Sequence, residues 1–330
     1  MTIHDSPSPL VRAHRPLRTV LIGTSLGGES DQVVRAGLAV ARAAGARVHL
    51  VHAVQLDPLL PGLEAEQIDR GGEELRLQIA RLGIQAPELA GAETRDGAPH
   101  RILTETAGRI GADLIVVGAT GSGPFAAELL GSTADRVLRK AACPVLVVRG
   151  ELTVPPRRVL APVDLSALSG DAFLCGLDLL AQLAGGGEIQ VRAVYALSVL
   201  DALAARQRTA GAPLEAAERS AAEELRRFAL EHRPEVPCSV ETAVLSGEAR
   251  FEILRELEER PVDLLILGTH GRGGLDRLVM GSVASTVARK APCSVLVISP
   301  EAALAEGIAE AVETQTAPAW HLGPVVASRT

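Results

Sequence analysis

The sequence predicts an α/β protein built from two doubly wound, five-stranded parallel sheets. Two observations lead to this prediction: apolar runs of strand length alternate with longer helical patterns, and much of this pattern occurs twice in the 330 residues. Near-continuous Val, Ile and Leu strands separated by helices indicate a parallel sheet covered by helices on both faces. A chain of this length also suits two domains of about 150 residues each.

The repeat is closest in the later part of each copy. A shift of 150 places lays DLIVVGATG (113–121) over DLLILGTHG (263–271), and GSTADRVLRKAACPVLVV (131–148) over GSVASTVARKAPCSVLVI (281–298). At the first strand the shift is 139, because TVLIGTS (19–25) lies over RVLAPVD (158–164). The second copy therefore holds about eleven extra residues, and we place most of them in the helical stretch 198–232.

Within the first copy, five strands and four helices are expected in alternation. The strand candidates are TVLIG, RVHLVHAV, AETRDG, DLIVVG and PVLVV, and helical spacing of apolar residues fills the segments between them. One helix, 99–111, should bury a face made of Ile102, Leu103, Thr106, Ala107 and Ile110. We expect domains at 18–149 and 158–299, a Pro-rich linker at 150–157 and a C-terminal extension at 300–330.

Composition excludes several classes of function. The chain has 33 basic and 40 acidic residues, no basic block, and only one Trp, one Tyr and four Phe, so nucleic acid is not an expected partner. Its apolar runs are shorter than the ~20 residues that a membrane helix needs. The four cysteines form no C-x-x-C pair and no metal-ligand spacing, and no signal-peptide core is found. These features favour the cytoplasm and predict no metal site formed by protein ligands.

Each copy carries the same glycine pattern, Gly-x-x-Gly, nine residues, then Gly-Ser. It comprises Gly118, Gly121, Gly131 and Ser132 in the first copy, and Gly268, Gly271, Gly281 and Ser282 in the second. The pattern follows a strand and opens a helix, whose free N–H groups and dipole favour a phosphate. The dipole alone contributes about 0.3–2 kcal/mol, too little to hold a nucleotide. The glycines are therefore either an anion-binding loop or the turns that every doubly wound fold requires.

With these motifs in place, both copies resemble universal stress protein domains, and the likeness covers roughly residues 18–149 and 157–299. The resemblance implies an adenine-nucleotide alpha-hydrolase-like fold with strand order 3-2-1-4-5. It also implies ATP as cofactor, with Mg²⁺ held through the phosphates. By the same resemblance, Asp164 and Val194 flank adenine in the second copy, and the ribose and phosphates are surrounded by Gly268, Gly271, Gly281, Ser282 and Val283. The matching residues of the first copy are Gly118, Gly121, Gly131 and Ser132.

The first copy departs from the family pattern. Ser25 stands in the place of Asp164, Ala53 in the place of Val194, and Pro124 stiffens its glycine loop. A weaker acceptor for the adenine edge costs about 1–3 kcal/mol of binding free energy. We therefore expect the second copy to be the stronger nucleotide site.

Three kinds of function follow from the sequence. The preferred one is a nucleotide-dependent sensor or regulator in a stress response; the others are a nucleotide-independent protein-interaction module and a weak ATPase. No lysine follows the Gly-Ser pair as in a P-loop, and no catalytic triad motif is found, so at most weak ATP hydrolysis is expected. Asp113 and Asp263 are expected to cap turns at the strand ends opposite the ligand.

The final strands, PVLVV and SVLVI, are apolar edges that would invite aggregation if left unpaired. By analogy with dimeric relatives, we expect them to pair with each other, so that the two copies form an internal pseudo-dimer. A further homodimer and a protein partner remain open.

Overall fold

A computed structural model describes residues 16–305, apart from 58, 60, 61, 120–129, 209–213, 233–237 and 272–279. In the first half, strands and helices alternate as the sequence predicts. The strands are β1 (Thr19–Thr24), β2 (Arg47–Val54), β3 (Leu89–Asp96), β4 (Leu114–Gly118) and β5 (Val145–Val148). The helices are α1 (Gly28–Ala44), α2 (Glu64–Arg81), the 3₁₀ turn η1 (Ala86–Glu88), α3 (Pro99–Ile110) and α4 (Ser132–Leu138).

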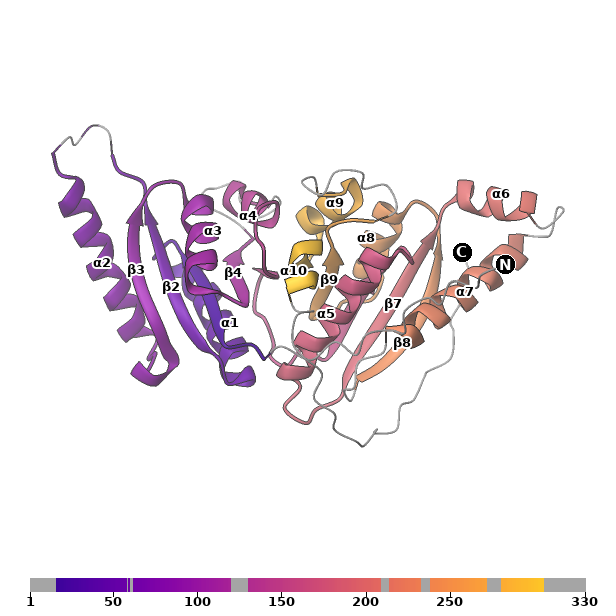
Figure 1. The fold of residues 1–330 in the computed structure, drawn as a ribbon, viewed down its shortest axis with the longest axis horizontal. Coiled ribbons are helices and arrows are strands. Elements are labelled where there is room, and N and C mark those ends of the chain that lie inside the picture. Colours follow the sequence, from indigo (N-terminus) through magenta and orange to yellow (C-terminus); the bar gives the residue numbers. More distant parts are fainter. Residues whose placement is uncertain are drawn as a thin grey trace, which may run out of the picture.

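The second half repeats the order of strands and α-helices, with one additional helix after its second strand and another after its last strand. Its strands are β6 (Arg158–Pro162), β7 (Ile189–Leu197), β8 (Cys238–Ser246), β9 (Leu264–Gly268) and β10 (Ser294–Ile298). Its helices are α5 (Ala167–Leu183), α6 (Val199–Arg208), α7 (Leu214–Glu231), α8 (Ala249–Glu259), α9 (Ser282–Lys290) and α10 (Pro300–Ala305). The additional helix after the second strand, α6, falls in the stretch where the extra residues were placed, and it lies at the far end of the second half (Figure 1).

The strands form one ten-stranded sheet in the order β3-β2-β1-β4-β5-β10-β9-β6-β7-β8. Each half is parallel, so the predicted order 3-2-1-4-5 is confirmed in both, and the two predicted sheets are joined into one. The junction is the antiparallel pair β5–β10, in which Leu146 faces Leu296. These two residues are equivalent in the repeat, so the pseudo-twofold axis passes between them. The expected internal pairing of the last strands is confirmed.

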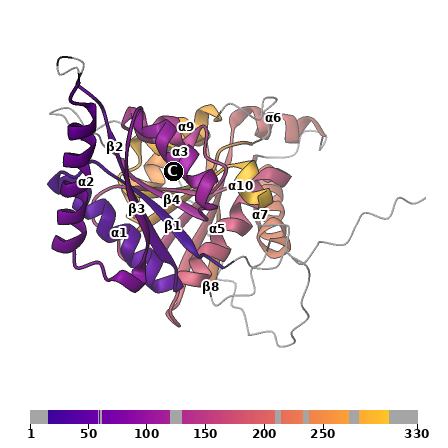
Figure 2. The same cartoon turned by 60° about the vertical axis from the view of Figure 1, so that its left-hand side comes forward.

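Helices cover both faces of the sheet. One core contains residues of α1, α2, α5, α7 and α10, and the other contains residues of α3, α4, α8 and α9. The rotated view of Figure 2 shows α1 and α2 on one side of the first half's strands and α3 on the other. Both faces of the sheet are therefore shielded from solvent by helices, which accounts for the continuous Val, Ile and Leu runs in the strands.

Helix α3 shows how local sequence defines an element. Pro99 occupies its first turn, where no backbone N–H is needed, and Gly111 ends it in the left-handed conformation with φ of 63°. Ile102, Leu103, Thr106 and Ala107 are buried, as the helical spacing predicts, whereas Ile110 on the same face is only half-buried.

Candidate functional site

Each half has a cavity at the carboxyl ends of its strands, next to β1 and β4 in the first half and β6 and β9 in the second. This is where the strand order reverses, the usual ligand position in open α/β sheets. The cavities measure about 810 Å³ in the first half and about 770 Å³ in the second. Both volumes lie within the roughly 300–1,000 Å³ typical of small-molecule sites.

The structure brings the predicted residues together. The second cavity is lined by all seven residues named for that copy, namely Asp164, Val194, Gly268, Gly271, Gly281, Ser282 and Val283. The first cavity is lined by Gly118, Gly131 and Ser132, whereas Gly121 and Pro124 lie outside the described residues. Residues from four separate segments of the second half thus meet at one cavity.

Asp164 is held in place by the first turn of α5. Its Oδ1 accepts hydrogen bonds from the Ser166 N–H at 3.0 Å and the Ser166 hydroxyl at 2.6 Å. Ser166 also caps α5 by accepting from the Ser169 N–H. Leu165, which lies between Asp164 and Ser166, adopts a left-handed conformation with φ of 63°. An L-residue adopts this conformation at a cost of about 1–2 kcal/mol. The turn therefore fixes the carboxylate at the cavity wall.

Gly271 lies directly against this carboxylate. A Cβ atom at position 271 would overlap Asp164 Oδ2, so a side chain here requires the carboxylate to move. Because Oδ1 is held by two hydrogen bonds, such a movement would break them. Close approach to Asp164 therefore explains the glycine at position 271.

Gly281 has a different role. Its N–H donates to the Thr269 carbonyl at 2.8 Å, and a Cβ here would lie 3.3 Å from that oxygen. In the first half, Gly131 N–H donates to the Ala119 carbonyl at 2.7 Å in the same way. The bond ties together the two ends of the glycine loop and uses the amide of Gly281. The amides of Ser282, Val283 and Ala284, in the first turn of α9, have no acceptor within the helix and are available to a ligand.

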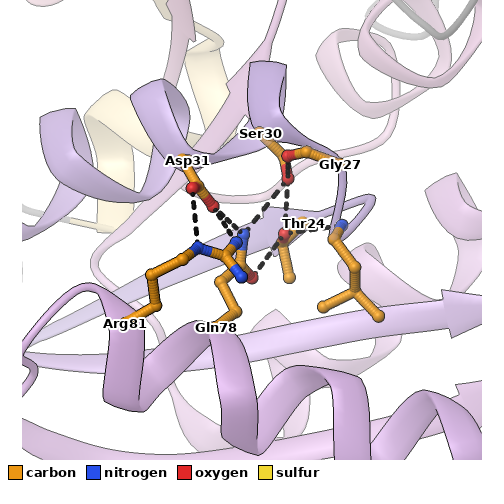
Figure 3. Close-up of polar contacts among 7 residues, drawn as sticks. Thr24, Gly27, Ser30, Asp31, Gln78 and Arg81 are labelled. Carbon is orange, nitrogen blue, oxygen red and sulfur yellow. Dashed lines mark hydrogen bonds and ion pairs between the residues drawn. The ribbon is translucent and has the colours of Figure 1, made fainter.

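The first cavity has Ser25 where the second has Asp164. Leu26, next to Ser25, has φ of 66°, so the backbone turn is the same in both halves. The neighbouring wall is a buried polar network that joins β1 to α1 and α2 (Figure 3). Gln78 Oε1 accepts from the Thr24 hydroxyl at 2.9 Å, and Gln78 Nε2 donates to Ser30 Oγ at 3.2 Å. Thr24 and Ser30 both line the cavity.

The strand register corrects one comparison between the copies. Val194 lies opposite Pro162, and at the equivalent place Val51 lies opposite Gly23. The counterpart of Val194 is therefore Val51 and not Ala53, because the shift between β2 and β7 is 143 rather than the 141 used for that match. Both valines are buried and line their cavities. The copies thus agree at this position, and the difference between Asp164 and Ser25 remains.

Several cavity residues were not found from the sequence. His52 in the first half and Tyr195 in the second occupy equivalent places, and His52 Nδ1 lies 3.0 Å from the Thr24 carbonyl oxygen. Asp201 reaches the second cavity from α6, and Arg149 lines the first. An alignment of the second strands at the correct shift would have identified His52 and Tyr195. Asp201 has no such signal because α6 is unique to the second half.

Asp113 and Asp263 lie away from both cavities. Asp113 Oδ2 accepts from the Arg18 and Thr19 N–H groups at 2.9 Å, and Asp263 Oδ2 accepts from those of Arg157 and Arg158 at 2.8 Å. These bonds fasten the amino ends of β1 and β6, opposite the ends that form the cavities. Both aspartates therefore hold the sheet together.

No helix among the described residues is long and apolar enough to cross a membrane. No group of three or more His, Cys, Asp or Glu side chains within them could hold a metal ion. The groups gathered at each cavity are hydroxyls, amides and isolated charged side chains, an arrangement suited to binding a polar small molecule.

Comparisons with known proteins place this architecture in a family. The model of the "Universal stress protein family" matches residues 16–149 and 156–299. The universal stress protein Rv2005c of Mycobacterium tuberculosis is 28% identical over 84% of this chain and 96% of its own length. A second protein of that organism, universal stress protein Rv2623, is 29% identical over 75% of this chain and 85% of its own length.

Solved structures share the fold. The crystal structure of a universal stress protein from Archaeoglobus fulgidus has a TM-score of 0.56 and 20% identity, covering 84% of this chain and 97% of that one. The protein PA1789 of Pseudomonas aeruginosa, described as functionally unknown, has a TM-score of 0.60 and 19% identity, covering 88% and 95%. The chain therefore belongs to the universal stress protein family and carries two of its domains in tandem.

Proposed function

We infer that this protein binds an adenine nucleotide, ATP with Mg²⁺ held through the phosphates, and acts as a nucleotide-dependent sensor or regulator in a stress response. The observation that supports it is the second cavity, where seven residues expected to bind the nucleotide line one space. The contact of Gly271 with Asp164 explains why the motif needs a glycine there. Ligand occupancy can regulate only if two states of the protein bind the nucleotide differently.

In this proposal, Asp164 and Val194 bind the adenine end of the nucleotide, and the first-turn amides of α9 bind phosphate oxygens. Hydrogen bonds to a charged carboxylate contribute about 1.5–3 kcal/mol. Ser25 in the first half offers a neutral hydroxyl instead. We therefore propose the second cavity as the stronger site, by roughly ten- to a hundredfold in affinity.

The test is to identify what the purified chain carries. Protein prepared without added nucleotide is denatured, and the released compounds are identified by chromatography and mass spectrometry. We expect ATP at about one per chain in the wild type. Gly271→Ala should lose most of it, because the new methyl group displaces the Asp164 carboxylate.

Gly108→Ala on α3 is the matched control, since a Cβ at that position meets no atom within 4 Å. Equal nucleotide content in the two variants would contradict the assignment of the second cavity. A wild-type protein that carries no nucleotide and binds no added ATP·Mg²⁺ would favour the interaction module. The exposed side chains of Val199, Leu200 and Leu203 on α6 offer such a module a surface.

Steady release of phosphate or AMP from the wild type would show a weak ATPase. Gly281→Val should abolish that release, because a side chain at position 281 meets the Thr269 carbonyl and loosens the glycine loop.

A further inference from the structure

Arg149 is a half-buried cation with few partners. It follows β5, lines the first cavity, and makes one side-chain hydrogen bond to the described residues, from Nη2 to the Arg289 carbonyl at 3.2 Å. Its Nε is buried and has no hydrogen-bond partner. Within the described residues, no carboxylate lies at ion-pair distance from it. Burial lowers the pKa of the Arg149 guanidinium, as expected for a cation that is poorly compensated.

Asp135, a carboxylate of the same half that Arg289 also contacts, does not neutralise this charge. Asp135, on the first turn of α4, is already bonded to two other arginines: Arg289 Nη2 at 2.9 Å and Arg139 Nε at 3.1 Å. Although burial raises the pKa of Asp135, the hydrogen bonds from Arg139 and Arg289 bring it below its ordinary value. Asp135 therefore has its own partners, and the charge of Arg149 remains uncompensated.

The equivalent position in the second half shows that a hydrogen bond between the two halves does not require a positively charged residue at this place. Ser299 occupies the place of Arg149, and its hydroxyl donates to the carbonyl of Ala141, three residues after the end of α4, at 3.4 Å. Arg149 likewise contacts the other half, at the Arg289 carbonyl in the last turn of α9. Because a neutral serine suffices on one side, the guanidinium on the other side calls for a separate explanation.

The position of Arg149 is fixed by its backbone. Its N–H donates to Ser294 Oγ at 3.0 Å, and that hydroxyl donates back to the Arg149 carbonyl at 3.3 Å. The hydroxyl residues Ser132 and Thr133 line the same cavity, as does Glu29 on α1. Apart from the Nη2 bond to Arg289, the guanidinium has no partner among the described residues, and an arginine at a cavity suits a phosphate, which its planar guanidinium binds through two oxygens.

We propose that Arg149 binds the phosphate groups of an adenine nucleotide in the first cavity, an inference that rests on the proposed function. The two sites then recognise different parts of the ligand. The described lining of the second cavity includes Asp164 and Asp201 but no Lys or Arg, whereas the first has Ser25 after β1, Arg149 after β5 and Glu29 on α1. Affinity at the first site should therefore rise steeply with the number of phosphates.

The test uses the full chain carrying Gly271→Val, which blocks the second site and leaves first-site binding to be measured. Dissociation constants for adenosine, AMP, ADP and ATP are obtained by calorimetry, with Arg149 intact and with Arg149→Ser, the residue found in the second half. We expect Arg149→Ser to weaken ATP binding about 10- to 100-fold and to leave adenosine binding unchanged. Arg149→Lys, which keeps the charge, should retain part of the phosphate dependence.

Arg136→Ser is the matched control, because it removes one positive charge from an exposed position on α4 that does not line the cavity. Thermal unfolding checks that every variant is folded. Equal ATP affinity in the Arg149→Ser and Arg136→Ser variants would overturn the proposal and leave Arg149 only its hydrogen bond between the two halves. ATP binding by the wild type but not in the Gly271→Val background would also overturn it, while the proposed function survives. No binding by the wild type would overturn both.

Discussion

Cys238 and Cys293 are thiols whose ionisation the fold opposes. Burial raises the pKa of both from an ordinary 9.0 to about 11. In the unfolded chain the thiols lose their protons near the ordinary value, so the unfolded state gains stability first as the pH rises. The free energy of unfolding should therefore be unaffected by these groups below about pH 8 and fall between pH 9 and 11.

The effect is at most about 2–3 kcal/mol per thiol, because the pKa rises from 9.0 to about 11. Urea unfolding from pH 7 to 10.5 measures it, with Cys238→Ala and Cys293→Ala as the comparison. Each variant should lose less stability than the wild type over the alkaline range. Parallel curves for wild type and variants would show that the thiols ionise normally in the folded state.

At the level of single residues, the sequence predicted positions better than roles. The glycine pattern located the second cavity, yet the reason for Gly271 is the Asp164 carboxylate, which lies more than 100 residues away in the chain. Gly281 lines the cavity as expected, and its amide has the further role of closing the loop, which the sequence did not predict. Arg149 could not be singled out, because an arginine is ordinarily exposed and only the fold shows that this one is half buried without a carboxylate.

At the level of elements, the two halves pack equivalent helices in different ways. Between α1 and α2, Gln78 is fully buried and bonds to Thr24, Ser30 and Asp31. Arg81 completes the network on Asp31 and holds the pKa of that carboxyl below its ordinary value. Between α5 and α7, the Phe228 ring instead lies 6.0 Å from that of Phe173 and 4.4 Å from that of His232.

Replacing Gln78 with Leu should therefore destabilise the first half. The substitution leaves the buried Thr24, Ser30 and Asp31 groups short of a partner, and each unsatisfied group costs about 1–3 kcal/mol. We expect the free energy of unfolding to fall by about 2–4 kcal/mol, measured by urea denaturation. Leu77→Ala, at the exposed neighbouring position on α2, is the control and should change it by less than about 0.5 kcal/mol. A similar loss in both variants would show that the network contributes nothing.

The spacing of apolar residues predicted the helices and strands because each element buries a continuous apolar face. Helix α3, for example, buries Ile102 and Leu103. The spacing could not predict what lies between elements. A glutamine in an amphipathic helix is ordinarily on the surface, and Gln78 becomes a core residue only because α1 places Ser30 and Asp31 against it.

On the scale of the whole molecule, the junction between the halves contains a small apolar cavity. It measures about 30 Å³ and is lined by apolar residues of both halves and of the linker, among them Leu146, Leu152, Leu179 and Leu296. The analogy with dimeric relatives, together with the apolar character of both edge strands, predicted that β5 and β10 would pair. It could not predict this void, which depends on how α1 and α5 approach each other across the axis.

Leu296→Ala should enlarge the cavity and cost about 2–5 kcal/mol of unfolding free energy. Because residues of both halves line this cavity, calorimetry should show the loss of stability in the unfolding of the whole chain and not of one half alone. Val40→Ile adds one methyl group to the same wall and should be neutral or stabilising by up to about 1 kcal/mol. Leu203→Ala, at an exposed position on α6, is the control. If it lowers the free energy of unfolding as much as Leu296→Ala does, the junction makes no special contribution to stability.

The antiparallel pair at Leu146 and Leu296 belongs to a single polypeptide. A pair of separate subunits dissociates when it is diluted, so its structure depends on how much protein a cell makes. Here the linker keeps the partner strand at a high effective concentration, and the pairing does not depend on expression level. The two cavities are therefore present one to one at any abundance. Because each is encoded by its own stretch of sequence, a substitution in one leaves the other as it was.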